Sequence, residues 1–172
     1  MKQEEQLDDL NALAPQACRA ELLKCCGSAR WAERMAEARP FDGINSMLES
    51  ADKIWWELDA EDWLEAFSHH PKIGEKRAAV VQSLDAARWS EQEQSAARTV
   101  EEETRNELLA LNRAYEERFR FIFIVCATGK TGEEMLALLK ERLRNNKDTE
   151  LRIAAEEQRR ITHLRLRKLL EQ

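Results

Sequence analysis

The sequence contains little that would interrupt a helix and no segment that would carry it through a membrane. Its 172 residues include only five Gly and three Pro, and no apolar run approaches the roughly 20 residues that a membrane span requires. Residues 1–10 are acidic and polar, unlike the apolar stretch of a signal peptide. The final Leu-Leu-Glu-Gln differs from a peroxisomal address of the Ser-Lys-Leu type. We therefore expect a cytoplasmic protein without a membrane partner.

Positive charge is not concentrated in any part of the chain. The sequence has 27 Lys and Arg against 33 Asp and Glu, which gives a formal net charge of −6. Nucleic-acid binding needs clustered basic residues that displace counterions from phosphates, whereas here basic and acidic residues are interleaved. We expect no nucleic-acid partner, and a basic helix lying on a membrane surface is disfavoured for the same reason.

The cysteines form neither a disulfide framework nor a zinc motif. No Cys-x-x-Cys pair occurs, and two of the four cysteines are adjacent. We expect all of them to be reduced, buried thiols. They are Cys18, Cys25, Cys26 and Cys126.

Other familiar site patterns are incomplete. The adjacent His69 and His70 lack the i, i+4 spacing of a helical metal site, and no carboxylate completes the set. A phosphate-binding loop ending at Gly129-Lys-Thr would need Gly where Ile124 stands. No Gly-x-Ser-x-Gly nucleophile elbow is present. We expect no metal site.

The residues that are abundant are those that lose little on entering a helix, namely Ala, Leu, Glu, Gln and Arg. Apolar residues recur at spacings of three and four, and no linker divides the chain. We predict an all-α fold with one domain over residues 1–172, a bundle of roughly seven to nine helices. Helices are expected at residues 15–26, 29–38, 42–58, 59–69, 90–119 (as one or two), 131–144 and from 148 almost to the C-terminus.

One stretch contradicts this pattern. Residues 121–126, Phe-Ile-Phe-Ile-Val-Cys, are β-branched and aromatic, which is typical of a buried strand. No second strand of comparable quality exists to pair with it, and an unpaired strand leaves its backbone groups unsatisfied. We expect a short, buried, irregular or extended passage between helices, close to a site, with backbone N–H groups free to bind a ligand.

The first candidates for chemistry are His69 and His70, in Ser-His-His-Pro-Lys-Ile-Gly. Loops that leave a rigid helix often carry catalytic groups, and histidine exchanges protons near neutral pH. Taken on spacing alone, the structural interpretation is stronger, because a residue before Pro71 is pushed out of the helical region and the two histidines then simply end the helix.

The second candidate is the group Ser90, Glu93 and Gln94. Ser-x-x-Glu is itself a capping box, which accounts for Ser90 and Glu93 but leaves Gln94 free. Polar side chains and free N–H groups at a helix N-terminus also favour an anionic ligand. Both interpretations are compatible, because a cap and an anion site share the same end of a helix.

The third candidate is Arg165, which lies four residues from both Ile161 and Leu169 on the apolar stripe of the last predicted helix. An arginine at such a position either pairs with a buried anion or extends its charged end to solvent. Spacing alone favours extension to solvent or an internal salt bridge.

Taken together and in order, these pieces resemble one family, the OHCU decarboxylases, from about residue 7 to about residue 170. Each piece is weak alone, but the ordered set is specific. The pieces are Trp-Ala-x-x-Met (31–35), Ala-Arg-Pro-Phe (38–41), His-His-Pro-Lys-Ile-Gly (69–74), Ser-x-x-Glu-Gln (90–94), Phe-Ile-Val-Cys-Ala-x-Gly-Lys-Thr (123–131), Arg-Leu-x-Asn (142–145) and Leu-Arg-Leu (164–166).

The resemblance implies an all-helical enzyme, usually a homodimer, without a metal or an organic cofactor. Its substrate would be 2-oxo-4-hydroxy-4-carboxy-5-ureidoimidazoline (OHCU), which loses CO2 and gains a proton on one face to give (S)-allantoin in urate breakdown. His70 would be the catalytic acid or base, oriented by Glu93. The implied substrate-binding residues are Pro71, Ser90, Glu93, Gln94, Phe123, Ile124, Val125, Cys126, Ala127 and Arg165.

The sequence departs from the family pattern at two positions. Arg120 stands where many members carry Gly, and Lys72 stands where Arg is commoner. Neither change removes a catalytic group, although Arg120 puts the backbone path into residues 123–127 in question.

Two other functions compete with the decarboxylase. A helical interaction module that has kept the fold would show no turnover, and the presence of all three polar elements argues against it. A ureide hydrolase would use Ser90 with His70 and Glu93. That geometry is awkward if Glu93 caps its own helix, and no oxyanion-hole motif is evident.

Overall fold

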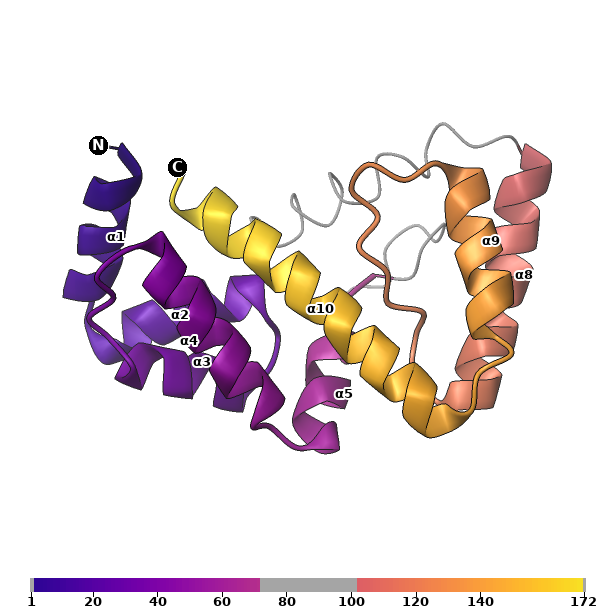
Figure 1. The fold of residues 1–172 in the computed structure, drawn as a ribbon, viewed down its shortest axis with the longest axis horizontal. Helices are drawn as coiled ribbons and strands as arrows, with labels where there is room; N and C mark the ends of the chain where they lie inside the picture. The colour runs from indigo at the N-terminus through magenta and orange to yellow at the C-terminus, as the bar shows by residue number, and fades with distance from the viewer. Residues whose placement is uncertain (1, 72–101, 172) are drawn as a thin grey trace. The chain divides into compact units, whose positions relative to one another are not determined.

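The computed structural model describes residues 2–71 and 102–171, and within these ranges it contains eight helices and no strand. The predicted helix-dominated fold is therefore confirmed. The helices are α1 (Lys2–Ala12), α2 (Pro15–Cys25), α3 (Ala29–Glu37), α4 (Ile44–Trp56), α5 (Ala60–Ser68), α8 (Glu102–Phe119), α9 (Gly132–Arg142) and α10 (Lys147–Leu169) (Figure 1).

The chain divides into two compact units. One comprises Met1–Ala66 with Arg159–Gln172, and the other comprises Phe67–Gln158. The expectation of one domain over residues 1–172 stays a prediction. Among the described residues, no helix has both the length and the apolar character needed to cross a membrane.

Several helix ends are set by local capping contacts. Thr131 and Glu134 form a reciprocal capping box at the start of α9, where a helix was expected to begin at residue 131. Ser28 caps α3 by accepting a hydrogen bond from the Trp31 N–H. The last helix begins at Lys147 rather than at residue 148, because the Asn146 side chain accepts the Thr149 N–H at 2.9 Å.

The first helix, α1, was not predicted, because its polar sequence carries only a faint apolar face. Leu7 and Leu10, three residues apart, are both buried. The Arg39 guanidinium donates hydrogen bonds to the carbonyls of Leu10 and Leu13, both at 2.8 Å, and thereby satisfies the end of this helix. The Ala-Arg-Pro-Phe motif therefore has a structural use here.

The core of the first unit is built around Trp31. Its side chain is completely buried, and its indole N–H donates to the Ala51 carbonyl on α4 at 3.2 Å. Helix α3, which carries Trp31 and the equally buried Met35, packs against both α2 and α4. The Trp-Ala-x-x-Met motif thus fills the middle of this unit.

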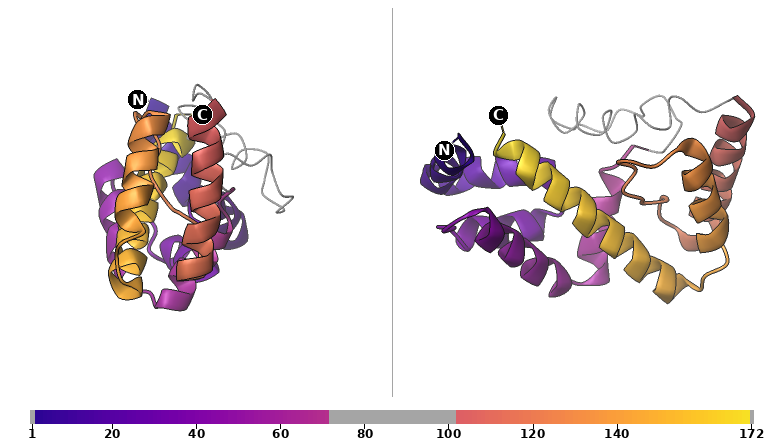
Figure 2. Two further views of the ribbon diagram at one scale, coloured as in Figure 1. Left: turned by 90° about the vertical axis from the view of Figure 1, so that its right-hand side faces the viewer. Right: turned by 45° about the horizontal axis from the view of Figure 1, so that its top comes forward.

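The core of the second unit is aromatic. Helices α8 and α9 run side by side in Figure 1 and in the left view of Figure 2. The buried Tyr115 of α8 has the rings of Phe119, Phe121 and Phe123 at centroid distances of 4.6, 5.8 and 5.3 Å. Phe67, at the end of α5, adds a fourth ring against Phe121 at 5.5 Å. Two of these rings come from residues 121–126, so the aromatic run packs as core without pairing as a strand.

Residues 121–127, here called the 121–127 passage, connect α8 to α9 without helix or strand. The expected buried, irregular passage is confirmed, since all but the intermediate Ile122 are at most 8% exposed. The backbone turns into it through Arg120, which has a φ of +67°, and Gly129 follows it with a φ of +78°. Positive φ is rare for a residue with a Cβ, which gives a physical reason why glycine suits position 120.

Candidate active site

The imidazole of His70 is held by a side chain from the last helix. His70 follows the end of α5, where its N–H donates to the Phe67 carbonyl at 3.1 Å. Its Nε2 lies 2.6 Å from Oε1 of Gln158, a fully buried residue of α10. An amide oxygen only accepts hydrogen bonds, so this contact requires the proton on Nε2.

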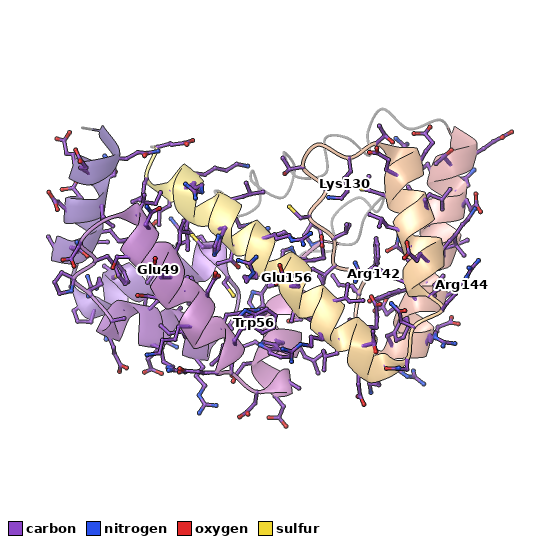
Figure 3. The ribbon with its side chains drawn as sticks, in the orientation of Figure 1. Glu49, Trp56, Lys130, Arg142, Arg144 and Glu156 are labelled. Atoms are coloured by element: carbon purple, nitrogen blue, oxygen red, sulfur yellow. The ribbon has the colours of Figure 1, made fainter. Side chains whose placement is uncertain are left out.

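The backbone of the 121–127 passage is held by side chains. Among the described residues, no backbone–backbone hydrogen bond involves residues 121–126. Instead Arg142 donates to the Ile124 carbonyl at 2.6 Å, and Lys130 donates to the Cys126 carbonyl at 2.7 Å. Glu157 accepts the Cys126 N–H at 2.7 Å. Figure 3 labels Lys130 and Arg142 beside this part of the chain.

One expectation for the passage is wrong at Cys126. Its N–H was expected to be available to a ligand together with those of its neighbours, but Glu157 already accepts it. A buried N–H needs a partner whether or not a ligand is bound, and the nearby carboxylate supplies one.

Two consecutive residues of α10 therefore connect the two parts of the candidate site. Gln158 contacts His70, and Glu157 contacts Cys126. Neither residue is among the site residues predicted from the sequence. A usable signal existed for Gln158, because it lies four residues after Ala154 and three before Ile161, both of which are buried. A buried polar side chain on an apolar stripe needs a specific partner.

Arg165 lies in the other compact unit and is 4% exposed, so its charged end does not extend to solvent. The thiols of Cys25 and Cys26 are close enough to feel its charge. Burial raises the pKa of Cys26 to about 11, and the Arg165 charge acts in the opposite direction. All four cysteines are buried and none forms a disulfide, as predicted.

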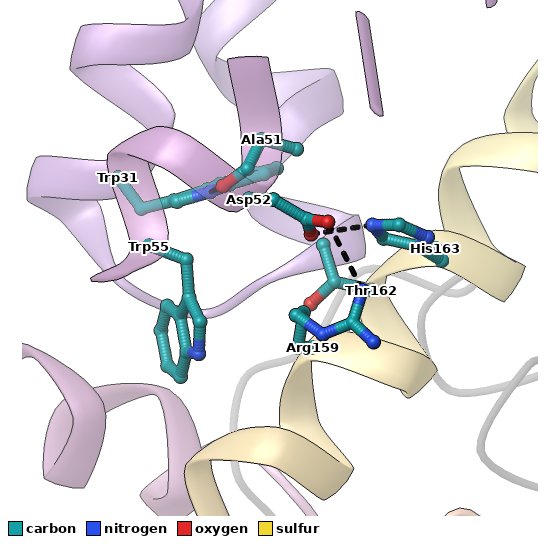
Figure 4. Close-up of a pocket in the computed structure, with 7 residues that line it drawn as sticks. All are labelled: Trp31, Ala51, Asp52, Trp55, Arg159, Thr162 and His163. Carbon is teal, nitrogen blue, oxygen red and sulfur yellow. Dashed lines mark hydrogen bonds and ion pairs between the residues drawn. The ribbon is translucent and has the colours of Figure 1, made fainter. Parts of the chain in front are cut away.

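A second polar cluster lies in the first unit, around a small pocket (Figure 4). Asp52 of α4 accepts from His163 Nε2 at 2.6 Å and from Arg159 at 3.0 Å, both on α10. The carboxylate thus ties α10 to α4 beside the rings of Trp31 and Trp55. Both carboxylate oxygens therefore have side-chain partners within the first unit.

The remaining predicted site residues, Ser90, Glu93 and Gln94, lie outside the described residues, as does Lys72. Pro71 follows His70 directly and is partly exposed. Within residues 2–71 and 102–171, no group of three His, Cys, Asp or Glu side chains is arranged to hold a metal ion.

The family model for OHCU decarboxylase matches residues 11–167. The uric acid degradation bifunctional protein TTL of Arabidopsis thaliana is 44% identical over 147 residues, covering 84% of this chain and 45% of that protein. The uric acid degradation bifunctional protein PucL of Bacillus subtilis (strain 168) is 32% identical over 161 residues, covering 93% of this chain and 32% of that protein. The chain thus spans less than half the length of these two relatives.

The fold also matches a solved structure. A crystal structure of OHCU decarboxylase in the presence of (S)-allantoin aligns with a TM-score of 0.77 and 38% sequence identity. The alignment covers 89% of this chain and 99% of that one.

Proposed function

Because the chain belongs to the OHCU decarboxylase family, we propose that it converts OHCU to (S)-allantoin and CO2 in urate breakdown. The observation that carries this proposal for the present chain is the pairing of the His70 imidazole with Gln158. This contact restrains a side chain that can exchange protons. Gln158 also directly follows Glu157, the α10 residue that binds Cys126 of the 121–127 passage.

The reaction requires little covalent chemistry from the protein. The bond between the ring carbon and the carboxylate breaks, CO2 leaves, and the electron pair stays on a carbon flanked by an imine or a carbonyl. That carbon then takes one proton on one face. The protein has to hold the substrate, stabilise the developing charge and deliver the proton stereospecifically. No metal or organic cofactor is required for these steps.

We assign the proton delivery to His70. The contact with Gln158 holds the ring through Nε2, and we propose that the imidazole transfers the proton that reaches the substrate carbon. Pro71 restricts the backbone of His70 to extended conformations, which limits the positions that its side chain can reach. Glu93 is proposed to keep the imidazole basic enough for the transfer.

Substrate binding is assigned to groups on several parts of the chain. Ser90 and Gln94 would bind the substrate together with Glu93 and Pro71. The backbone of Phe123, Ile124, Val125, Cys126 and Ala127 would line the ring and the ureido group. Arg165 would meet anionic or carbonyl oxygens, because a buried guanidinium is well suited to bidentate contacts with such oxygens.

We also propose that the protein is a homodimer, as its family implies. Light scattering coupled to gel filtration measures the mass of the particle directly. A mass close to twice 20.0 kDa supports the dimer, and a mass close to that of one chain contradicts it.

The decisive experiment compares the two adjacent histidines. OHCU is generated freshly by urate oxidation, and its decay is followed by circular dichroism, which separates (S)-allantoin from the racemate. We expect His70→Gln to fold normally and to lose most stereospecific product. His69→Asn, the matched control, should keep most of it. Because spontaneous decay gives racemic allantoin, the enantiomeric excess tests the proton donor separately from substrate capture.

Two outcomes count against the proposal in different ways. No acceleration of OHCU decay by the unmodified protein would refute the decarboxylase activity. Near-normal (S) product from His70→Gln would leave the activity standing and show that the proton comes from another group.

A further inference from the structure

The Arg-Leu-x-Asn motif at residues 142–145 has no role in the chemistry described above, yet its arginine makes several buried contacts in the second unit. Arg142 is 5% exposed and Glu150, its ion-pair partner, is completely buried. The two lie 2.6 Å apart, with both Nε and Nη2 of the guanidinium directed at Oε1 of the carboxylate. A buried charge of this kind persists only with full hydrogen bonding.

The carboxylate is satisfied by neighbours of Arg142 as well. The Tyr115 hydroxyl donates to Oε1 at 2.5 Å, and burial raises the pKa of this hydroxyl, so it remains a donor. The Asn145 side chain donates to Oε2 at 2.9 Å. Asn145 therefore supports Glu150 from the opposite oxygen, and among its described contacts none is with the 121–127 passage.

The other side of the guanidinium is directed at the passage. Its Nη1 donates to the Ile124 carbonyl at 2.6 Å, and its Cζ lies 4.5 Å from the ring centroid of Phe123. These are successive residues of the segment proposed to line the substrate. Among residues 2–71 and 102–171 no backbone–backbone hydrogen bond involves residues 121–126, and side chains such as Arg142 and Lys130 bind this backbone instead.

We propose that Arg142 is a positioning residue, which holds the 121–127 passage in the conformation that receives the substrate. This inference rests on the proposed function. The planar guanidinium donates to Glu150 and to Ile124 from different nitrogens while its face covers Phe123. Lysine carries the same charge, but as a single ammonium group it cannot reproduce the fork and the stacked face together.

The test compares Arg142→Lys with Asn145→Ala. Both weaken the network around Glu150, but only the first changes a contact with the passage. We expect both variants to unfold at lower denaturant concentration. Arg142→Lys should also lose about tenfold or more in kcat/KM, mainly through KM, because displacement of binding groups by ~1 Å costs about that much or more. Asn145→Ala should keep the KM of the unmodified protein.

A second readout is independent of turnover. Amide hydrogen exchange of residues 122–127 should accelerate in Arg142→Lys well beyond the change in global stability, and in Asn145→Ala it should follow global stability alone. If the unmodified protein does not turn OHCU over, the proposed function fails, and hydrogen exchange still decides whether Arg142 holds the passage.

If Arg142→Lys does not fold, the double variant Arg142→Met/Glu150→Gln replaces it, because removing both charges avoids a buried unpaired ion. The same loss in kcat/KM and the same local exchange are expected. The inference is wrong if either Arg142 variant shows the KM and the exchange pattern of Asn145→Ala once stability is matched.

Discussion

Replacing Arg120 with glycine should stabilise the protein, although most substitutions to glycine destabilise. Arg120 directly follows α8, is exposed, and has a φ of +67°. Its N–H donates to the Glu116 carbonyl at 2.8 Å, so the residue ends the helix in the left-handed conformation where glycine is normally preferred.

The magnitude follows from two opposing terms. A residue with a Cβ in this conformation costs roughly 1–2 kcal/mol. Glycine relieves that strain but adds about 0.5–1 kcal/mol of backbone entropy to the unfolded chain. We expect a net gain on the order of 1 kcal/mol, which corresponds to an increase in Tm of about 2–4 °C for a protein of this size.

Denaturant unfolding followed by circular dichroism measures this gain, with Arg113→Gly as the matched control. Arg113 is also exposed, but it lies within α8, where glycine should cost about 1 kcal/mol. Arg120→Ala removes the same side chain without relieving φ and should change little. If Arg120→Gly is destabilising like Arg113→Gly, the backbone at position 120 does not store the expected strain and the reasoning fails.

Three further outcomes are expected. Gln158→Leu should fold but lose roughly 10–100-fold in kcat, because His70 would no longer be held; an unchanged kcat would show that Gln158 does not position it. Burial raises the pKa of Cys26 from 9.0 to about 11, so the thiol's contribution to stability, on the order of 2 kcal/mol, is complete below pH 9 and is lost as the pH rises toward 11. Between pH 8 and pH 10.5 the urea midpoint should therefore fall less for Cys26→Ala than for the unmodified protein, and equal falls would contradict this. Arg165→Ala should weaken substrate binding, measured through KM, by a larger free energy than it removes from the free energy of unfolding. If the variant unfolds while its surviving fraction keeps a normal KM, Arg165 is structural.

The local sequence determined where several helices begin and end and where the buried passage follows α8. The Thr131 cap at the start of α9, the end of α2 within one residue of position 26 and the buried passage after residue 120 were all predictable. Each depends on residues within about four positions along the chain, because caps and helical spacing act over that range. Helix α1 escaped prediction because its stability depends on contacts with Arg39, which is 29 residues away from Leu10.

The ordered motifs were also enough to identify the family, but only the tertiary structure decided which side chains hold the residues of the candidate site. Gln158 reaches His70 across 88 positions of the chain, and Glu157 reaches Cys126 across 31. Arg142 contacts Ile124 across 18 positions. Hydropathy and spacing mark such residues only as polar groups on helices. Their partners are set by how the helices pack, because a buried hydrogen bond depends on which atoms the fold brings within about 3 Å.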